Sequence, residues 1–253
     1  MVLQLIPSVQ SLNITWERLP DNYVLPDDPV ETIQQPLLAA ALTDALGEAG
    51  WIQPRMLIAS NFGLVATVAG KTVVKSPDWL YIPDAIPVTE GVVRRSYTPN
   101  LEGTPAAIVM EFLSETDTGE YSVRPIYPYG KLYFYERILQ VPTCVMFDPQ
   151  DLILEVRQLQ EGRYVLQHPN GEGRYWIPQM RLFLGSWQGT RLGTTTLWLR
   201  WWDEAGNLLL WSSEKAEQER RRAEQERQRA EAAEEELVRL RALLEERSPR
   251  SPQ

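Results

Sequence analysis

The chain has 253 residues, of which 43% are hydrophobic, so it is long enough to bury one sizeable core or two small ones. Its single cysteine, Cys144, excludes an internal disulfide framework, and no stretch reaches the roughly 18 apolar residues of a membrane span. The net charge of −9 argues against tight, non-specific binding of nucleic acid by a broad basic surface.

The first residues lack a basic region followed by a long apolar run, so we predict no signal peptide and a cytoplasmic protein. Residues 1–27 contain three prolines and are expected to be irregular. A helix should follow, with its cap and first turn at Asp27-Asp28-Pro29 and its end at Gly47 and Gly50. Pro36 marks either a later start of this helix or a kink in it.

Short β-branched and apolar runs predict strands at 56–59, 63–68, 72–74 and 79–82. After a loop over 83–104, residues 106–112 (AAIVMEF) indicate a central strand buried on both faces. A polar loop at 114–130 leads to a helix at 131–139 and a buried strand at 143–147. Antiparallel strands are expected at 152–159 and 163–167, and a hairpin between 197–202 and 208–211. These elements predict an α+β domain over residues 28–212.

Residues 213–247 should form a charged helix, followed by a disordered tail at 248–253. Ala216, Ala223, Ala230, Leu237 and Leu244 keep a strict seven-residue spacing. A solvated single helix held by (i, i+4) ion pairs explains residues 214–232 equally well. For residues 233–244 a short coiled coil is favoured, which joins two copies in a homodimer or recruits another protein. Residues 214–250 have a net charge of only −1, so the rest of the chain carries a net charge of about −8.

Three polar residues stand at positions where the core pattern calls for apolar ones. Asp78 precedes a strand, Glu111 lies near the end of the buried strand, and Lys131 begins a helix. A carboxylate at a buried strand end is costly unless it is paired or binds a cation. Two such carboxylates with a nearby lysine could hold Mg²⁺ or Mn²⁺ and activate water for phosphodiester hydrolysis.

Four blocks of the chain, taken in order, resemble the Uma-type restriction endonucleases, a branch of the PD-(D/E)XK nuclease superfamily. The blocks contain Pro77-Asp78, Glu111-Phe112-Leu113-Ser114, Lys131 with Tyr135, and Asp148-Pro149. The resemblance covers about residues 30–210. It implies a restriction-endonuclease-like core of mixed β-sheet flanked by helices, with added antiparallel hairpins and a C-terminal coiled-coil helix.

The same resemblance implies a DNA endonuclease in which Asp78 and Glu111 bind Mg²⁺ or Mn²⁺ and Lys131 assists the attacking water. The superfamily's usual lysine two residues after the acidic residue is absent, because Leu113 stands there, and Lys131 would take its place. Asp84, in a second Pro-Asp pair, is a weaker candidate than Asp78 because no apolar strand follows it. Glu31 is a further candidate for the metal site.

Simpler interpretations remain open for each residue. Asp78 could cap a turn, Glu111 could pair with Arg124 or Arg137, and Lys131 could be a surface cation. The chain as a whole could be an inactive nuclease-like protein that acts through its coiled-coil tail. A carbohydrate-binding module would require exposed tryptophans. Nucleophilic triads are poorly supported, since the single histidine, His168, lies in a predicted turn and Cys144 in a predicted buried strand.

Overall fold

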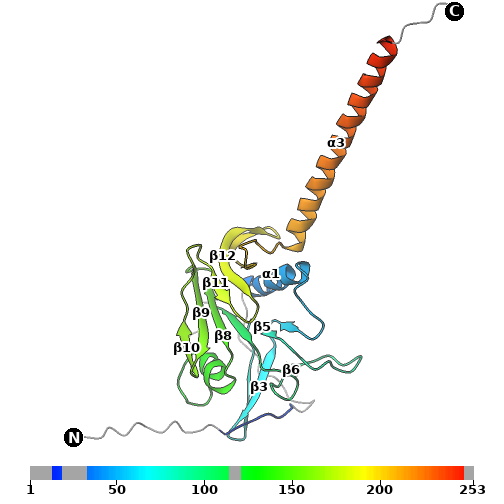
Figure 1. Ribbon diagram of the computed structural model, residues 1–253. Helices are drawn as coiled ribbons and strands as arrows, with labels where there is room; N and C mark the ends of the chain where they lie inside the picture. Colours follow the sequence, from blue (N-terminus) through cyan, green and yellow to red (C-terminus); the bar gives the residue numbers. More distant parts are fainter. Residues whose placement is uncertain (1–12, 19–32, 114–120, 248–253) are drawn as a thin grey trace, which may run out of the picture. The chain divides into compact units, whose positions relative to one another are not determined.

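The structure, a computed structural model, describes residues 13–18, 33–113 and 121–247 (Figure 1). The chain divides into two compact units, Met1–Leu209 and Leu210–Gln253. The first is an α+β domain of three sheets with helices, as the sequence predicted. The second contains the long helix α3 (Ser212–Arg247). No helix in the described ranges is both long and apolar enough to cross a membrane.

A six-stranded sheet forms the centre of the first unit, in the order β10-β9-β8-β7-β5-β2. Its strands are β2 (Leu57–Ala59), β5 (Trp79–Ile82), β7 (Ile108–Phe112), β8 (Thr143–Asp148), β9 (Ile153–Gln160) and β10 (Arg163–Leu166). Only β7 and β8 pair in parallel, and the sheet is therefore mixed. Strands β8, β9 and β10 lie side by side at one end of it (Figure 1). Every residue of β5 and β7 is buried, which explains their continuous apolar sequences.

Two smaller sheets complete the first unit. One contains β1 (Ile14–Thr15), β3 (Gly63–Val68), β4 (Lys71–Lys75) and β6 (Ser96–Tyr97), with β6 parallel to β3. The other contains β11 (Tyr175–Ile177), β12 (Leu182–Arg191) and β13 (Thr194–Trp202), all antiparallel. Strands β1 and β6 correct the expectation that residues 1–27 and 83–104 lack regular structure.

Helix α1 (Gln34–Glu48) packs its apolar face on β13. Pro36 lies in its first turn, where a missing backbone N–H is tolerated, so the proline begins the helix rather than kinking it. The start predicted at Asp27-Asp28-Pro29 lies outside the described residues. The buried side chains recur at helical spacing: Leu38, Ala39, Ala41, Leu42, Ala45 and Leu46. Thr43 also accepts a 3.0 Å hydrogen bond from the indole of Trp79, which ties α1 to β5.

The predicted hairpin between 197–202 and 208–211 is wrong. Strand β13 pairs along its length with β12, and only an isolated bridge joins Trp202 to Leu208. Strand β12 escaped prediction because its glycines resemble turn residues. A Cβ on Gly185 would lie 3.1 Å from the ring of Trp202 and 3.2 Å from Arg174, so the glycine makes room for an indole inside a strand.

Candidate active site

The pairing of β5 with β7 brings Asp78 and Glu111 together. Trp79 lies opposite Met110 in this antiparallel pair, and the next step of the same register puts Asp78 opposite Glu111. Directly opposed residues point to the same face of a sheet, with Cβ atoms about 4.5–5.5 Å apart. The carboxylate of Asp78 also accepts a 2.5 Å hydrogen bond from the backbone N–H of Phe112. The two acidic residues are therefore held side by side by the sheet itself.

Glu111 is 1% exposed, and three side chains converge on its carboxylate. Oε1 accepts a 2.7 Å hydrogen bond from the hydroxyl of Tyr135. Oε2 lies 3.0 Å from the ammonium of Lys131 and 3.5 Å from the hydroxyl of Tyr121. Glu111 thus pairs with Lys131 and not with Arg124 or Arg137, the two arginines considered from the sequence. Arg137 instead donates to the carbonyl of Gly162.

Lys131 is the first residue of the short helix α2 (Lys131–Tyr133), and its side chain is 11% exposed. A cation at a helix N-terminus meets the positive end of the helix dipole, and the contact with Glu111 offsets that repulsion. The structure thus brings Asp78, Glu111 and Lys131 into one cluster from three separate parts of the chain. Leu113 is partly buried against the hydrophobic core.

Tyr135 lies one turn beyond Lys131, where the helix widens. The segment Phe134–Ile138 is a π-helix, η1, in which the N–H of Leu139 bonds to the carbonyl of Phe134 at 2.8 Å. The single helix predicted over residues 131–139 is therefore α-helical only at its start. Single π-turns inside helices are frequent at functional sites. The (i, i+4) spacing puts Tyr135 on the same face as Lys131, so both side chains reach Glu111.

Tyr135 and Tyr121 are contacts of the site to which the sequence analysis gave no role. For Tyr135 the signal was present, because the Lys-x-x-x-Tyr spacing belongs to the pattern that carries the family resemblance. For Tyr121 no sequence signal exists, since its contact with Glu111 depends on the path of the loop that follows β7.

Burial raises the pKa of Glu111 to about 8, against the lowering effect of Lys131. The charge of Asp78 raises the same pKa further, while the hydrogen bond from Tyr135 lowers it. Two adjacent carboxylates in a low-dielectric site repel each other when both are ionised. A divalent cation between them would remove that repulsion and favour ionised Glu111.

The donor set fits a magnesium-type ion that is completed by other ligands. No cluster of three or more histidine, cysteine or acidic residues suited to a metal occurs within the described ranges. Mg²⁺ is usually held by one or two carboxylates, with waters and substrate phosphate oxygens filling its octahedral shell. Each carboxylate oxygen has two lone pairs, and Oε1 of Glu111 accepts a hydrogen bond from Tyr135, so its second lone pair can bind a cation.

The other acidic candidates do not join this cluster. Asp84 follows the opposite end of β5, where its carboxylate forms a 2.5 Å ion pair with Arg55 and its backbone N–H bonds to Thr104. Asp148 caps the turn after β8, because its carboxylate accepts hydrogen bonds from the backbone N–H groups of Gln150 and Asp151. Glu31 lies outside the described residues.

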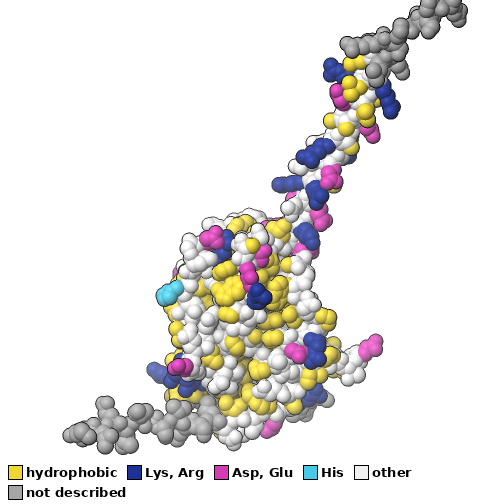
Figure 2. All heavy atoms as spheres, in the orientation of Figure 1, with side chains coloured by type: hydrophobic (Ala, Val, Ile, Leu, Met, Phe, Trp, Pro, Cys, Tyr) yellow, Lys and Arg dark blue, Asp and Glu magenta, His cyan; other side chains and the backbone are white. Residues whose placement is uncertain are grey.

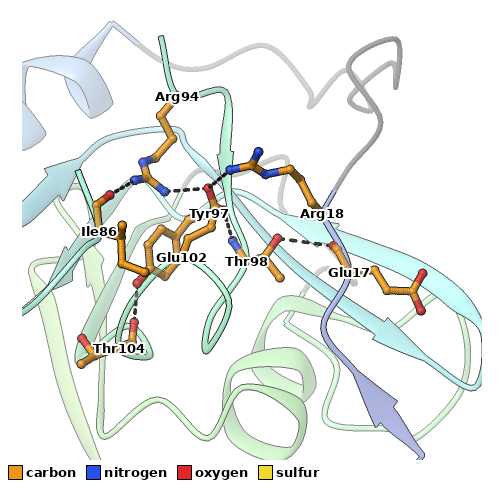
Figure 3. Close-up of polar contacts among 8 residues, drawn as sticks. All are labelled: Glu17, Arg18, Ile86, Arg94, Tyr97, Thr98, Glu102 and Thr104. Atoms are coloured by element: carbon orange, nitrogen blue, oxygen red, sulfur yellow. Dashed lines mark hydrogen bonds and ion pairs between the residues drawn. The ribbon is translucent and has the colours of Figure 1, made fainter. Parts of the chain in front are cut away.

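A buried ion pair stabilises the loop between β5 and β7 (Figure 3). Arg94 donates to Oε1 of Glu102 at 2.7 Å and to the carbonyl of Ile86 at 2.5 Å. The second oxygen of Glu102 accepts a 2.6 Å hydrogen bond from the N–H of Thr98. Each partner is satisfied within the loop, so this cluster has a structural explanation.

Other chemistries find no support in the described residues. Burial raises the pKa of the Cys144 thiol far above its usual range, which removes it as a nucleophile. Trp198, Trp201 and Trp202 are buried, so they do not form the exposed surface that a carbohydrate-binding module requires.

Residues 13–191 match the family model Uma2, whose description is "putative restriction endonuclease". The chain belongs to the Uma2 family. The match extends from β1 through β12 and includes Asp78, Glu111 and Lys131, so the cluster lies within the Uma2 domain. Helix α3 lies outside the matched region. Comparison with curated proteins gives no match. Membership in Uma2 supports a nuclease-like role and agrees with the resemblance in the four sequence blocks.

Proposed function

We propose that the protein is a Mg²⁺- or Mn²⁺-dependent endonuclease that hydrolyses phosphodiester bonds of DNA. The observation that carries the proposal is the convergence of Asp78, Glu111 and Lys131, with the lysine ammonium 3.0 Å from the glutamate. Membership in a family of restriction-endonuclease type supports it. The reducing compartment indicated by the single buried cysteine supports a cytoplasmic location.

In this proposal Asp78 and Glu111 hold the metal ion. When bound, such an ion polarises a phosphoryl oxygen and lowers the pKa of a water molecule. Lys131 orients the attacking water with its ammonium protons and partly neutralises the phosphate charge. Tyr135 acts through Glu111, since its 2.7 Å hydrogen bond fixes the carboxylate orientation.

The net negative charge of the chain is compatible with this role, because its affinity for DNA need not come from a broad basic surface. Burial and the adjacent Asp78 raise the pKa of Glu111, so its ionised form is disfavoured when no metal is bound. A divalent cation adds two positive charges at the point where the phosphate must approach. DNA binding should therefore depend more strongly on metal than it does for a basic nuclease.

Cleavage of supercoiled plasmid and of single-stranded DNA tests the proposal, with Mg²⁺ or Mn²⁺ and with chelator as the blank. Glu111→Gln and Lys131→Ala should abolish cleavage. Glu161→Gln and Lys215→Ala, which change the same residue types outside the cluster, should leave it unchanged. Metal-dependent cleavage that survives both cluster variants would overturn the assignment of these residues.

A second candidate is an inactive nuclease-like protein that acts through α3. The charge of about −8 on the rest of the chain favours it. Wild-type protein that binds neither metal nor DNA, yet self-associates or captures a partner through α3, would decide for this candidate.

We further propose that α3 joins two copies of the chain. Leu237, Val238, Leu240 and Leu243 are between 46% and 66% exposed. Figure 2 shows acidic and basic side chains interleaved along α3, with hydrophobic side chains gathered toward its C-terminal end. Five ion pairs within α3 lie between Glu217 and Glu231. The first half thus resembles a solvated helix, and the leucine-rich end resembles a coiled-coil seam.

A further inference from the structure

The segment from Tyr121 to Lys131 begins and ends at the same carboxylate oxygen. The Tyr121 hydroxyl lies 3.5 Å and the Lys131 ammonium 3.0 Å from Oε2 of Glu111. The intervening residues form a loop that is closed across the candidate active site, and we call residues 121–131 the active-site loop. Whatever this loop contacts is therefore held close to the cluster of Asp78, Glu111 and Lys131.

The active-site loop exposes apolar side chains. Val123 is 56% exposed, Ile126 64% and Tyr127 50%. Single exposed apolar residues are ordinary, but three within five residues concentrate exposed apolar area in one short segment. Its position beside a candidate catalytic site indicates that a ligand of that site covers it.

Tyr127 is the outermost ring of a ladder that starts on the helix of Lys131. Tyr133, in α2, is 7% exposed and stacks on Tyr129 with 5.3 Å between ring centroids and 20° between planes. Tyr129 meets Tyr127 edge-on, with centroids 5.8 Å apart. A ring held by such contacts loses little conformational freedom when a ligand covers it.

Basic groups accompany the exposed ring. The Lys71 ammonium, from the start of β4, lies over one face of the Tyr127 ring, 4.6 Å from its centroid, so a base would stack on the opposite face. Arg124 is exposed on the same loop. An aromatic platform with cations beside it is the arrangement by which proteins bind single-stranded nucleic acid, in which bases stack on rings and cations meet phosphates.

We propose that the active-site loop is a stacking site for an unpaired base of the DNA substrate. The platform is the face of Tyr127 opposite Lys71, and the Lys71 ammonium attracts the neighbouring phosphate. This inference rests on the proposed endonuclease function and adds a substrate preference for single-stranded or locally unpaired DNA. Inside a duplex the faces of the bases are covered by their neighbours, so a side chain can stack only on an unpaired base.

Two further observations agree with an unpaired substrate. Lys131 is four residues after Tyr127, which limits the distance between their Cα atoms to about 14 Å. A base on Tyr127 therefore belongs to a nucleotide near the scissile phosphate. In addition, stacking does not depend on net charge, whereas duplex binding by phosphate contacts is weakened by an acidic chain such as this one.

Fluorescence anisotropy tests the inference with labelled oligothymidylate of about 20 nucleotides, which covers one binding site of the usual size. A duplex of the same length is measured beside it. Both are titrated with Ca²⁺ in place of Mg²⁺, a hard cation that also takes oxygen ligands, and a gel checks that no cleavage occurs. Tyr127→Ala should weaken binding of the single strand about 5- to 150-fold, the loss expected for one stacked base. Tyr127→Phe, which keeps the ring, should bind like wild type, as should Leu192→Ala, a control exposed apolar residue on the β12–β13 turn.

The outcomes separate this inference from the proposed function. Wild-type protein that cuts DNA while Tyr127→Ala binds the single strand normally would overturn the stacking site and leave the nuclease intact. Tyr127-dependent binding without any metal-dependent cleavage would support the stacking site and overturn the nuclease. Failure of wild type to bind any oligonucleotide, or tighter binding of duplex that is insensitive to Tyr127, would also overturn the inference. In those cases a protein ligand becomes the alternative occupant of the loop.

Discussion

Lys131 and Glu111 form an ion pair, 3.0 Å between Nζ and Oε2, across a sequence separation of 20 residues. In the PD-(D/E)XK pattern that the sequence blocks resemble, the lysine stands two residues after the acidic residue, a position that Leu113 occupies here. The β-strand alternation directs residues 111 and 113 to the same side of the chain. A lysine from α2 therefore reaches the carboxylate from a different element and leaves the strand end apolar.

A lysine returned to the strand should partly replace Lys131. Lys131→Met should reduce DNA cleavage at least about 100-fold, the usual loss on removing a group that positions or transfers a proton. Adding Leu113→Lys to that variant should recover part of the activity, measured as initial rates of plasmid nicking with Mg²⁺. The single variant Leu113→Lys serves as control for damage to the core that Leu113 contacts. A double variant as inactive as Lys131→Met, with a normal melting curve, would contradict the prediction.

The stability of the metal-free protein should fall as the pH rises from about 4.5 to about 8. Burial raises the folded-state pKa of Glu111 from 4.5 to about 8, so the folded protein keeps a proton that the unfolded chain releases. The contribution of protonated Glu111 to stability is complete below pH 4.5, the pKa in the unfolded chain. It is lost as the pH rises to about 8, the pKa in the folded protein. Thermal melts of wild type and Glu111→Gln isolate this effect, because the other titrating groups are common to both.

Mg²⁺ or Mn²⁺ should raise the melting temperature more at pH 8 than at pH 6. The ion needs ionised Glu111, so metal and proton compete for the same carboxylate. Isothermal titration at both pH values measures the affinities directly. Equal affinities at pH 6 and pH 8 would mean that Glu111 is not a ligand.

Removal of the Tyr135 hydroxyl should weaken metal binding about tenfold, as the loss of a group that orients a ligand usually does. Tyr135→Phe should also lower the free energy of unfolding by about 1–3 kcal/mol, because a buried carboxylate loses a hydrogen bond. Tyr164→Phe is a matched control, since its hydroxyl donates to the carbonyl of Val141 at 3.0 Å. It should affect stability and leave metal affinity unchanged.

The charges beside the leucine-rich seam of α3 predict a parallel pair of helices. Leu237 and Leu240 occupy the a and d positions of the heptad. In a parallel pair of helices, the g position of one copy faces the following e position of the other. These g and e positions are Arg229 with Glu234, and Glu236 with Arg241. Both pairs are attractive. Glu234→Arg should therefore weaken the dimer several-fold, and the double variant Arg229→Glu with Glu234→Arg should restore it.

Sedimentation equilibrium of the full-length chain over a range of concentrations measures this association. Leu237→Asp with Leu240→Asp should give a monomer at every concentration. In an antiparallel pair g faces g and e faces e, so the double charge variant would not recover the dimer.

The central strands of the fold could be predicted closely because burial on both faces leaves a continuous apolar run. The predicted limits of 63–68 and 79–82 coincide with β3 and β5. The predicted buried strand at 143–147 differs from β8 by one residue. Such strands can be predicted without knowing which strands they pair with, since a continuous apolar sequence indicates that both faces are buried.

The other elements depend on tertiary contacts that periodicity does not record. Gly185 looks like a turn residue, yet it lies within β12 because the ring of Trp202 occupies the space of its side chain. At the site, Asp78, Glu111 and Lys131 could be selected as polar residues at positions where the core pattern calls for apolar ones, and the family pattern contains all three. The contact of Tyr121 with Glu111 could not be found, because it depends on how the chain returns to the sheet after β7.

The register that sets Asp78 opposite Glu111 also sets which side chains of β5 and β7 enter the core. A slip of one residue would separate the two carboxylates and turn the apolar side chains of β5 to the wrong face. The proposed metal site therefore cannot exist before the sheet is correctly assembled. If the chain cuts DNA as proposed, a nascent or misassembled copy would be harmless to the genome, because the cutting site forms only when the fold is complete.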